Sequence, residues 1–146
     1  MTLAFNNIGS LGRLGNQMFE YAALRGIAAR HSYKWMIPPP ERKGIENYSL
    51  HNCFKLSPDR NEGIMDPCQY AQEPYFHFCE DLFETCPDNI SLNGFFQSWR
   101  YFANVTEQLR EDFTFHDGIL NPCKEMMDCL LYTSDAADEG LGVDLG

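Results

Sequence analysis

The sequence GRLGNQMF, at residues 12–19, carries more structural information than any other stretch of this 146-residue chain. A short apolar run at residues 3–5 precedes it, and a helical pattern from Met18 to about Arg30 follows it. A strand, a glycine turn and a helix in this order point the unpaired N–H groups of the helix N-terminus beyond the strand. We therefore expect an anion, most often a phosphate, to bind there.

Four residues of this turn are candidate ligand-binding residues: Arg13, Gly15, Asn16 and Gln17. Glycine lets the backbone approach a ligand closely, and the side chains of Arg13 and Asn16 add donors that a purely structural turn does not need. Each has an alternative role. Asn16 also suits the N-cap of the helix, Arg13 could pair with an acidic neighbour, and Gln17 fits a structural role equally well.

Size and composition indicate one globular domain and exclude some functions. A chain of this length buries roughly 70% of its unfolded surface, and 44% of its residues are hydrophobic. The formal net charge of −10 argues against a nucleic-acid partner, because phosphates would be repelled. No apolar run approaches the ~20 residues of a membrane span, and the N-terminus lacks a signal-peptide pattern. We therefore expect a cytoplasmic protein with no integral membrane segment, and we leave peripheral attachment to a membrane surface open.

The spacing of the six cysteines gives no zinc pattern, because no two of them are separated by two residues. In the cytosol they would stay reduced. We interpret them as packing thiols, with disulfides and metal ligands as the alternatives, and we predict no metal site. The six are Cys53, Cys68, Cys79, Cys86, Cys123 and Cys129.

The remaining patterns predict an α/β fold. A second strand at 33–37 is stopped by three prolines, so the first helix would connect parallel strands by a right-handed crossover. Further strands are expected at 75–78 and at 89–96, and a helix at about 99–112. The first helix has an apolar stripe with three small residues, which predicts close packing against the sheet. The stripe consists of Phe19, Ala22, Ala23, Gly26 and Ile27.

Gln97 and Ser98 follow the strand expected at 89–96 and would lie at its carboxyl edge, where open α/β sheets bind ligands. We treat both as tentative substrate contacts, with a helix-capping role as the alternative for Ser98. The aromatic residues around them fit the hydrophobic core better than a sugar-stacking surface. These are Phe95, Phe96, Tyr101 and Phe102.

Two segments together resemble one family. GRLGNQMFEYA at residues 12–22 is similar to the opening signature of the α-1,2-fucosyltransferases, glycosyltransferase family 11, and GFFQSWRYF at 94–102 is similar to its second N-terminal signature. The spacing of Tyr48, Leu50, Cys53, Phe54 and Leu56 also fits, as does REDFTF at 110–115. The resemblance covers nearly all of residues 1–120 in the right order.

This resemblance implies a Rossmann-like domain, one of the two that form the glycosyltransferase-B architecture. Family members transfer L-fucose from GDP-fucose to the 2-hydroxyl of a galactose, with inversion and without a required cofactor or metal ion. The implied partners are therefore GDP-fucose and a galactose-terminated glycan. A related Gly-x-x-Gly-Asn-Gln turn in other fucosyltransferases lies at the donor phosphate and sugar, which supports Gly15 and Asn16 as donor contacts.

The family's main donor-binding motif, His-x-Arg-Arg-x-Asp, does not occur in the chain. We therefore expect an N-terminal, acceptor-side fragment at residues 1–129 that lacks the second domain and is inactive by itself. The run LLYTSDAADE at 130–139 resembles translated sequencing-adapter DNA, so residues 130–146 are expected to be a non-native tail, with a disordered acidic tail as the alternative.

The catalytic base is not identified from the sequence, because Glu73, His77 and Asp81 all lie in the acceptor-side stretch. Two other functions remain open. One is an enzyme fragment like a protein O-fucosyltransferase, since the glycine turn alone does not separate the two families. The other is a non-catalytic α/β binding module.

Overall fold

The computed structural model describes the backbone of residues 1–145 and the side chains of residues 1–134. By its internal contacts the chain divides into two units, residues 1–114 and residues 115–146. The first unit contains the sheet and the segments of both family signatures. The second consists mainly of one helix, α5 (Asp117–Leu145), which has Pro122 near its start. The prediction that residues 130–146 are a non-native tail stays a prediction, and the side chains from 135 onward lie outside the described residues.

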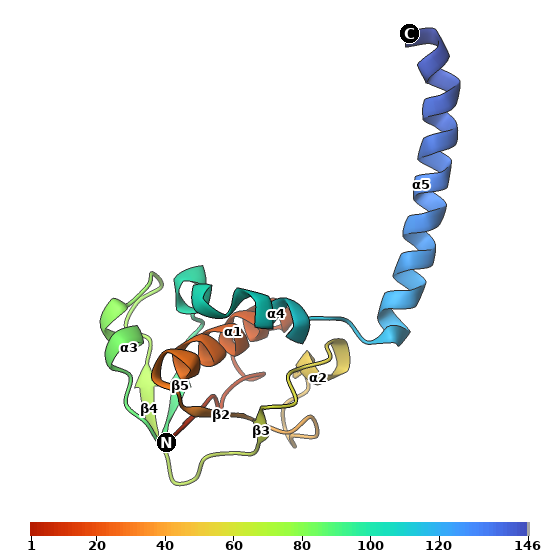
Figure 1. The fold of residues 1–146 in the computed structure, drawn as a ribbon. Coiled ribbons are helices and arrows are strands. Elements are labelled where there is room, and N and C mark those ends of the chain that lie inside the picture. Colours follow the sequence, from red (N-terminus) through yellow and green to blue (C-terminus); the bar gives the residue numbers. More distant parts are fainter. Residues whose placement is uncertain (146) are drawn as a thin grey trace. The chain divides into compact units, whose positions relative to one another are not determined.

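The first unit is an α/β structure with a five-stranded parallel sheet, as the sequence predicted (Figure 1). The strands are β1 (Thr2–Ala4), β2 (Lys34–Ile37), β3 (Asn61–Glu62), β4 (Gln69–Gln72) and β5 (Ile90–Asn93). Their order in the sheet is β3-β2-β1-β5-β4, and each neighbouring pair is parallel. This central position of β1 brings the loop after it between the loops that follow β2 and β5. The arrangement is consistent with a Rossmann-like domain.

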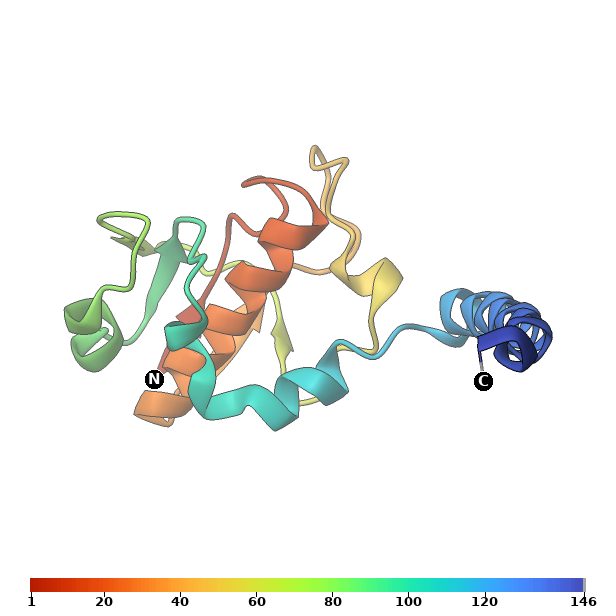
Figure 2. The same cartoon turned by 90° about the horizontal axis from the view of Figure 1, so that it is seen from above.

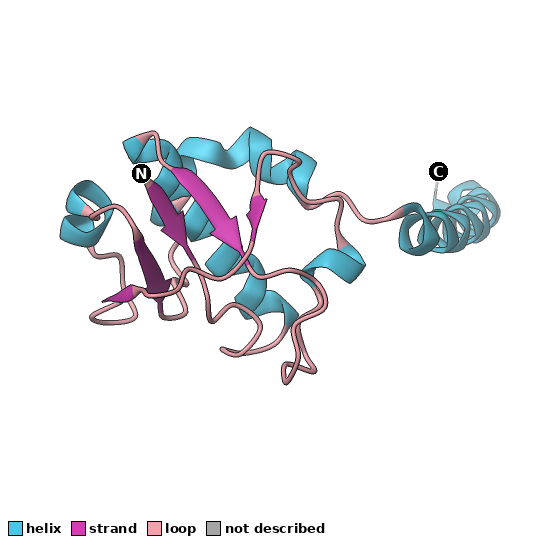
Figure 3. Ribbon diagram, turned by 90° about the horizontal axis from the view of Figure 1, so that it is seen from below, coloured by secondary structure: helices cyan, strands magenta, loops and turns pink. Residues whose placement is uncertain are grey.

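Helices connect and cover these strands. α1 (Leu14–His31) connects β1 to β2, and the short α2 (Leu50–Cys53) and α3 (Glu80–Thr85) lie in the later connections. After β5 come two 3-10 turns, η1 (Trp99–Tyr101) and η2 (Ala103–Val105), and then α4 (Thr106–Asp112). From above, α1 lies in front of the strands (Figure 2), whereas from below the strands lie in front of α1 (Figure 3). None of the described helices is both long and apolar enough to cross a membrane.

Two of the predicted elements are wrong in detail. The strand expected at 75–78 does not form; those residues are bends, and the edge strand is β4 at 69–72. The strand was predicted from the apolar residues at 75–78. In the structure, however, Tyr75 and Phe76 are exposed rather than buried in a sheet. The helix expected at 99–112 is interrupted, because its first half forms the two 3-10 turns and only its second half is α-helical.

The small residues of α1 allow close packing, and at Gly26 the close neighbour is the segment after β5, which contains η1. A Cβ at Gly26 would lie 2.0 Å from the carbonyl oxygen of Tyr101 and 2.8 Å from Cα of Phe102. The side chain of Asn104 donates to the Gly26 carbonyl oxygen at 2.9 Å. Gly26 therefore fixes the segment after β5 directly on α1.

The face of α1 toward the sheet carries an unexpected acidic residue. Glu20 is fully buried, and neither of its carboxylate oxygens has a hydrogen-bond partner among the described residues. Burial without a partner penalises the charged form and raises the pKa of Glu20 to about 9. Glu20 is therefore neutral in the folded chain at pH 7.

A second buried group connects α1 to α4. The Tyr21 hydroxyl donates to Asp112 Oδ2 at 2.9 Å, and Arg25 forms an ion pair with the same oxygen at 3.0 Å. The Tyr21 oxygen also accepts from the backbone N–H of Ser57 at 3.3 Å. One tyrosine thus ties α1, α4 and the loop before β3 together.

We predict that Gly26→Ala destabilises the chain by about 1–3 kcal/mol, because the new methyl group meets backbone atoms that cannot move without shifting η1. Gly15→Ala in the same helix is the matched control, since nothing lies within 4 Å of its Cβ position. Urea denaturation measures both variants. Equal stabilities for the two would contradict the close approach at Gly26.

We also predict that the stability of the chain falls as pH rises from 4.5, the ordinary pKa of a glutamate, to about 9. In this window the folded chain keeps a proton on Glu20 that the unfolded chain has released, so the free energy of unfolding drops by up to about 1.4 kcal/mol per pH unit. Glu20→Gln should remove this slope, so its stability relative to the parent should rise steadily as the pH increases from 5 to 8.

The measurement is urea denaturation at pH 5, 6.5 and 8. The control is Glu46→Gln, which changes an exposed glutamate. If the free energy of unfolding changed with pH in the same way for the parent and for Glu20→Gln, that result would contradict a neutral buried Glu20.

Candidate functional site

The N-terminus of α1 opens at the carboxyl edge of the sheet, where β1 ends. The helix begins at Leu14, and the N-cap position is Arg13, with an extended backbone and no capping side chain. The first turn contains no acidic residue. Its N–H groups, the positive end of the helix dipole, therefore stay available to an anion from solution.

The expectation that Asn16 caps the helix is wrong, because Asn16 lies inside the first turn. Its side chain instead lies over Gly12, where a Cβ would come within 2.2 Å of Asn16 Nδ2. Gly12 also has a φ of +85°, which disfavours any other residue. Gly12 therefore sets the position of the Asn16 side chain, while Arg13 and Gly15 remain exposed.

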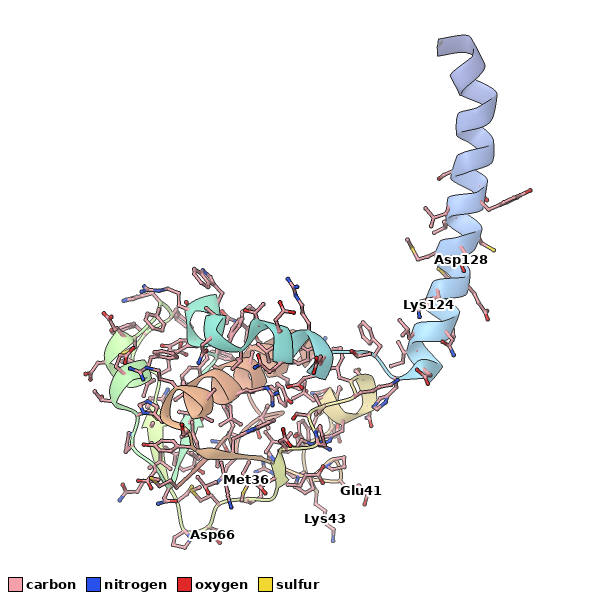
Figure 4. All side chains as sticks on the ribbon, viewed as in Figure 1. Met36, Glu41, Lys43, Asp66, Lys124 and Asp128 are labelled. Atoms are coloured by element: carbon pink, nitrogen blue, oxygen red, sulfur yellow. The ribbon has the colours of Figure 1, made fainter. Side chains whose placement is uncertain are left out.

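Gln17 is fully buried, and its amide holds the neighbouring loop. Nε2 donates to the Asn47 carbonyl oxygen at 2.6 Å, and Oε1 accepts from the Ser49 N–H at 3.0 Å. Figure 2 shows this loop, between β2 and α2, beside the start of α1, and Figure 4 shows Glu41 and Lys43 projecting from it. These contacts favour a positioning role for Gln17. Its predicted contact with the donor stays a prediction.

A hydrogen bond joins the segments of the two signatures. Gln97 Nε2 donates to Asn16 Oδ1 at 2.7 Å, across 81 residues of sequence. Gln97 is exposed and Asn16 half-buried, so both amides border solvent in front of the helix N-terminus. The structure therefore brings together two residues that the sequence analysis selected separately, and their roles in ligand binding stay predictions.

The turn that carries Gln97 is held by Glu73, whose role the sequence did not reveal. Glu73 Oε2 accepts from the backbone N–H groups of Phe95 and Phe96 at 3.0 and 2.9 Å. Phe96 has a φ of +51°, a conformation that a bulky residue rarely adopts without support. The carboxylate supplies that support. No local signal pointed to it, because the two segments are more than 20 residues apart.

Gly94 lets Glu73 reach the turn. A Cβ at Gly94 would lie 2.5 Å from Cβ of Glu73, and the φ of Gly94 is +145°. A side chain here would both strain the backbone and displace the carboxylate. Glu73 and Gly94 therefore form one positioning unit behind Gln97.

Ser98 has the helix-capping role that the sequence analysis gave as its alternative. Its hydroxyl accepts from the Arg100 N–H at 3.4 Å and caps η1. Its predicted substrate contact stays a prediction. Phe96 and Tyr101 are fully buried, in agreement with their interpretation as core residues.

The three candidate bases differ in their surroundings. Glu73 is nine-tenths buried, His77 stacks on the ring of Tyr75 with centroids 3.8 Å apart, and Asp81 is exposed in α3. The structure thus separates them by position, with only Glu73 in contact with the Gln97 turn.

A larger groove of about 550 Å³ runs along the outer face of α1 toward α4. Its lining is almost entirely apolar and includes Phe19, Leu109 and Phe113. Such a lining has few donors to fix a phosphate. Although Gly15 and Arg110 also line this groove, it is therefore a less suitable place for an anion than the helix N-terminus.

Comparisons with known proteins agree with the resemblance. The chain is 29% identical over 122 residues to galactoside α-(1,2)-fucosyltransferase 1 of Rattus norvegicus and 30% identical over 112 residues to that of Mus musculus. The human protein of the same name is 26% identical over 118 residues. The chain is similar to the galactoside α-(1,2)-fucosyltransferases. No protein-family model and no solved structure matches it.

The similarity is confined to part of each fucosyltransferase. The matches cover 73–80% of this chain but only 27–31% of the rat, mouse and human proteins. The chain thus spans about three tenths of the length of the curated relatives it matches.

We predict a measurable coupling between Asn16 and Gln97. In a double-mutant cycle with Asn16→Ala and Gln97→Ala, the loss of their hydrogen bond should give an interaction energy of about 0.5–1 kcal/mol. Denaturant unfolding of the four proteins measures it. As a control, Asn16→Ala combined with Asn104→Ala should be additive within roughly 0.5 kcal/mol. Additivity in the first cycle as well would contradict the bond.

Proposed function

We propose that this chain is the N-terminal, acceptor-side part of an inverting α-1,2-fucosyltransferase of the glycosyltransferase-B architecture. In this proposal the complete enzyme transfers L-fucose from GDP-fucose to the 2-hydroxyl of a terminal galactose on a glycan. The observation that carries the proposal is the hydrogen bond between Asn16 and Gln97, because it places one residue from each signature segment at a single helix N-terminus. The printed names of the relatives, all galactoside fucosyltransferases, favour a glycan over a folded protein as acceptor.

The chemistry requires stabilisation of negative charge. As the bond between the fucose carbon and the diphosphate breaks, charge accumulates on GDP, and donors fixed near that charge lower the barrier. The N–H groups of the first turn of α1 and the guanidinium of Arg13 would meet the diphosphate. Asn16, oriented by Gly12 and Gln97, would bind the phosphate or the sugar through its free N–H.

The site on this chain supplies few charges for this task. Arg13 is the only cation of the turn at 12–19, and the His-x-Arg-Arg-x-Asp motif does not occur in the sequence. We therefore expect GDP binding without catalysis, with a Kd near the millimolar range or about −4 kcal/mol. Incubation with GDP-fucose and lactose should give no fucosylated product.

A second test is genetic. The DNA that follows the Cys129 codon in the source should encode the arginine motif, and its absence from the next hundred residues would count against the proposal.

We predict that GDP perturbs the backbone amide resonances of residues 12–17 and 97 in an NMR titration, because phosphate would replace water at the N–H groups of the helix end. Asn16→Ala should weaken binding several-fold, and Gly15→Leu, which adds a bulky side chain within the first turn of α1, should abolish it.

The control for Asn16→Ala is Asn52→Ala, which changes an exposed asparagine in α2. Binding that survives both Asn16→Ala and Gly15→Leu unchanged would disprove the phosphate position. A Kd in the micromolar range would disprove the expectation that the missing arginines are needed for tight binding.

A further inference from the structure

A small pocket of about 260 Å³ lies at the carboxyl ends of β4 and β5, apart from the helix N-terminus. It is lined by Gln72, Glu73 and Asn93 from the two strand ends, by Tyr75 and Phe76 from the following loop, and by Leu11. None of the residues predicted to bind donor or substrate lines it, whereas Glu73, one of the three candidate bases, does. Its volume and its mixture of aromatic and amide groups suit a small polar ligand.

Amide side chains form a chain of hydrogen bonds along this edge of the sheet. Asn7 donates to Asn93 at 3.0 Å, Asn93 donates to Gln72, and Gln72 donates to the Glu73 carbonyl oxygen at 3.3 Å. Each amide side chain in this row of hydrogen bonds keeps a second N–H and a second lone pair. Donors and acceptors therefore alternate along the pocket, in fixed positions.

Glu73 contributes an acceptor that is still without a partner. Its Oε2 is occupied by the two backbone N–H groups, whereas its Oε1 is buried and has no hydrogen-bond partner in the part of the chain that the structure describes. A buried carboxylate oxygen without a donor costs free energy. A ligand hydroxyl that enters the pocket can supply that donor.

Two aromatic rings beside the pocket are exposed without serving the core. Phe76 is 74% exposed and Tyr75 44% exposed, and His77 covers Tyr75 by stacking. An exposed ring next to fixed amide and carboxylate groups provides an apolar face beside hydrogen-bonding groups. A pyranose ring has the same two kinds of surface, since C–H groups form its faces and hydroxyls its rim.

We propose that this pocket binds the acceptor sugar, a neutral pyranose such as a β-galactoside. In this arrangement the ring of Tyr75 or Phe76 packs against the C–H face of the sugar. The amides of Asn93 and Gln72 bind adjacent hydroxyls, and Glu73 Oε1 accepts a hydrogen bond from a third. The inference rests on the proposed function for the identity of the sugar, but its location follows from this pocket alone.

The pocket and the N-terminus of α1 are formed in part by the same two loops. Leu11 lines the pocket and lies in the same loop as Gly12 and Arg13, which lead into α1. On the other side Glu73 and Phe95 line the pocket, and the turn they form carries Gln97 to Asn16. A sugar in the pocket and a diphosphate at the helix end would therefore be held by the same two loops.

The experiment is an NMR titration of the 146-residue chain with methyl β-D-galactopyranoside. We expect shifts in the amide resonances of residues 72–76 and 93–95, side-chain amides included. Tyr75→Ala and Phe76→Ala together should weaken binding at least fivefold. The matched control is Tyr70→Ala, which removes an exposed tyrosine of β4 outside the pocket and should leave binding unchanged. All these side chains are exposed, so the variants are expected to fold, which circular dichroism checks.

Mannitol, an acyclic polyol without a ring face, should cause no comparable shifts. Equal shifts with mannitol, shifts confined to other residues, or a galactoside response that survives the double variant would each overturn the inference. A separate GDP titration distinguishes its failure from that of the proposed function. If GDP shifts residues 12–17 while the galactoside shifts nothing, the sugar pocket is wrong and the donor position stands; with the opposite result the donor position fails and the pocket stands.

Discussion

The candidate site depends on the two hydrogen bonds that Glu73 accepts from the turn after β5. Phe96 adopts a left-handed backbone conformation in this turn, which costs about 1–3 kcal/mol unless its surroundings compensate. The carboxylate compensates by binding the N–H groups of Phe95 and Phe96, and Gly94 leaves it the space to do so. The turn then directs Gln97 to Asn16 and orients the amide in front of the α1 N-terminus. A carboxylate just after the edge strand β4 thereby supports the position of Gln97 beside the first turn of α1.

Local sequence predicted those parts of the structure that depend on near neighbours in the chain. The run at 3–5, the glycine turn at 12–15 and the strand at 34–37 follow from patterns within a few residues, and the structure contains each of them. Gln97 was placed at a strand end by the same reasoning. The parallel pairing of β1 and β2 followed from the helix between them.

The remaining features depend on contacts between distant segments. Asn16 suits an N-cap by composition, but the positive φ of Gly12 starts the helix earlier and moves Asn16 into the first turn. Gln17 is buried, and its amide forms hydrogen bonds with the backbone of the loop at 47–49. The sequence around Gln17 does not predict these contacts. Glu20 looks like an ordinary surface acid in the sequence, and Glu73 was only one of three candidate bases. Their roles follow from packing against residues that the sequence does not identify as neighbours.

The negative net charge of the chain affects the two proposed ligands differently. With a net charge of −10, the chain as a whole repels a diphosphate, so GDP must be held by local groups. In the proposed enzyme these would be the neutral N–H groups of the helix and the single cation Arg13, and such a set is worth far less than a cluster of guanidinium groups. A neutral sugar meets no such repulsion, and a buried carboxylate oxygen favours it over any anion. In the proposed enzyme, Glu73 would favour the neutral acceptor and the N–H groups at the start of α1 would favour the anionic donor, so charge would distinguish the two positions.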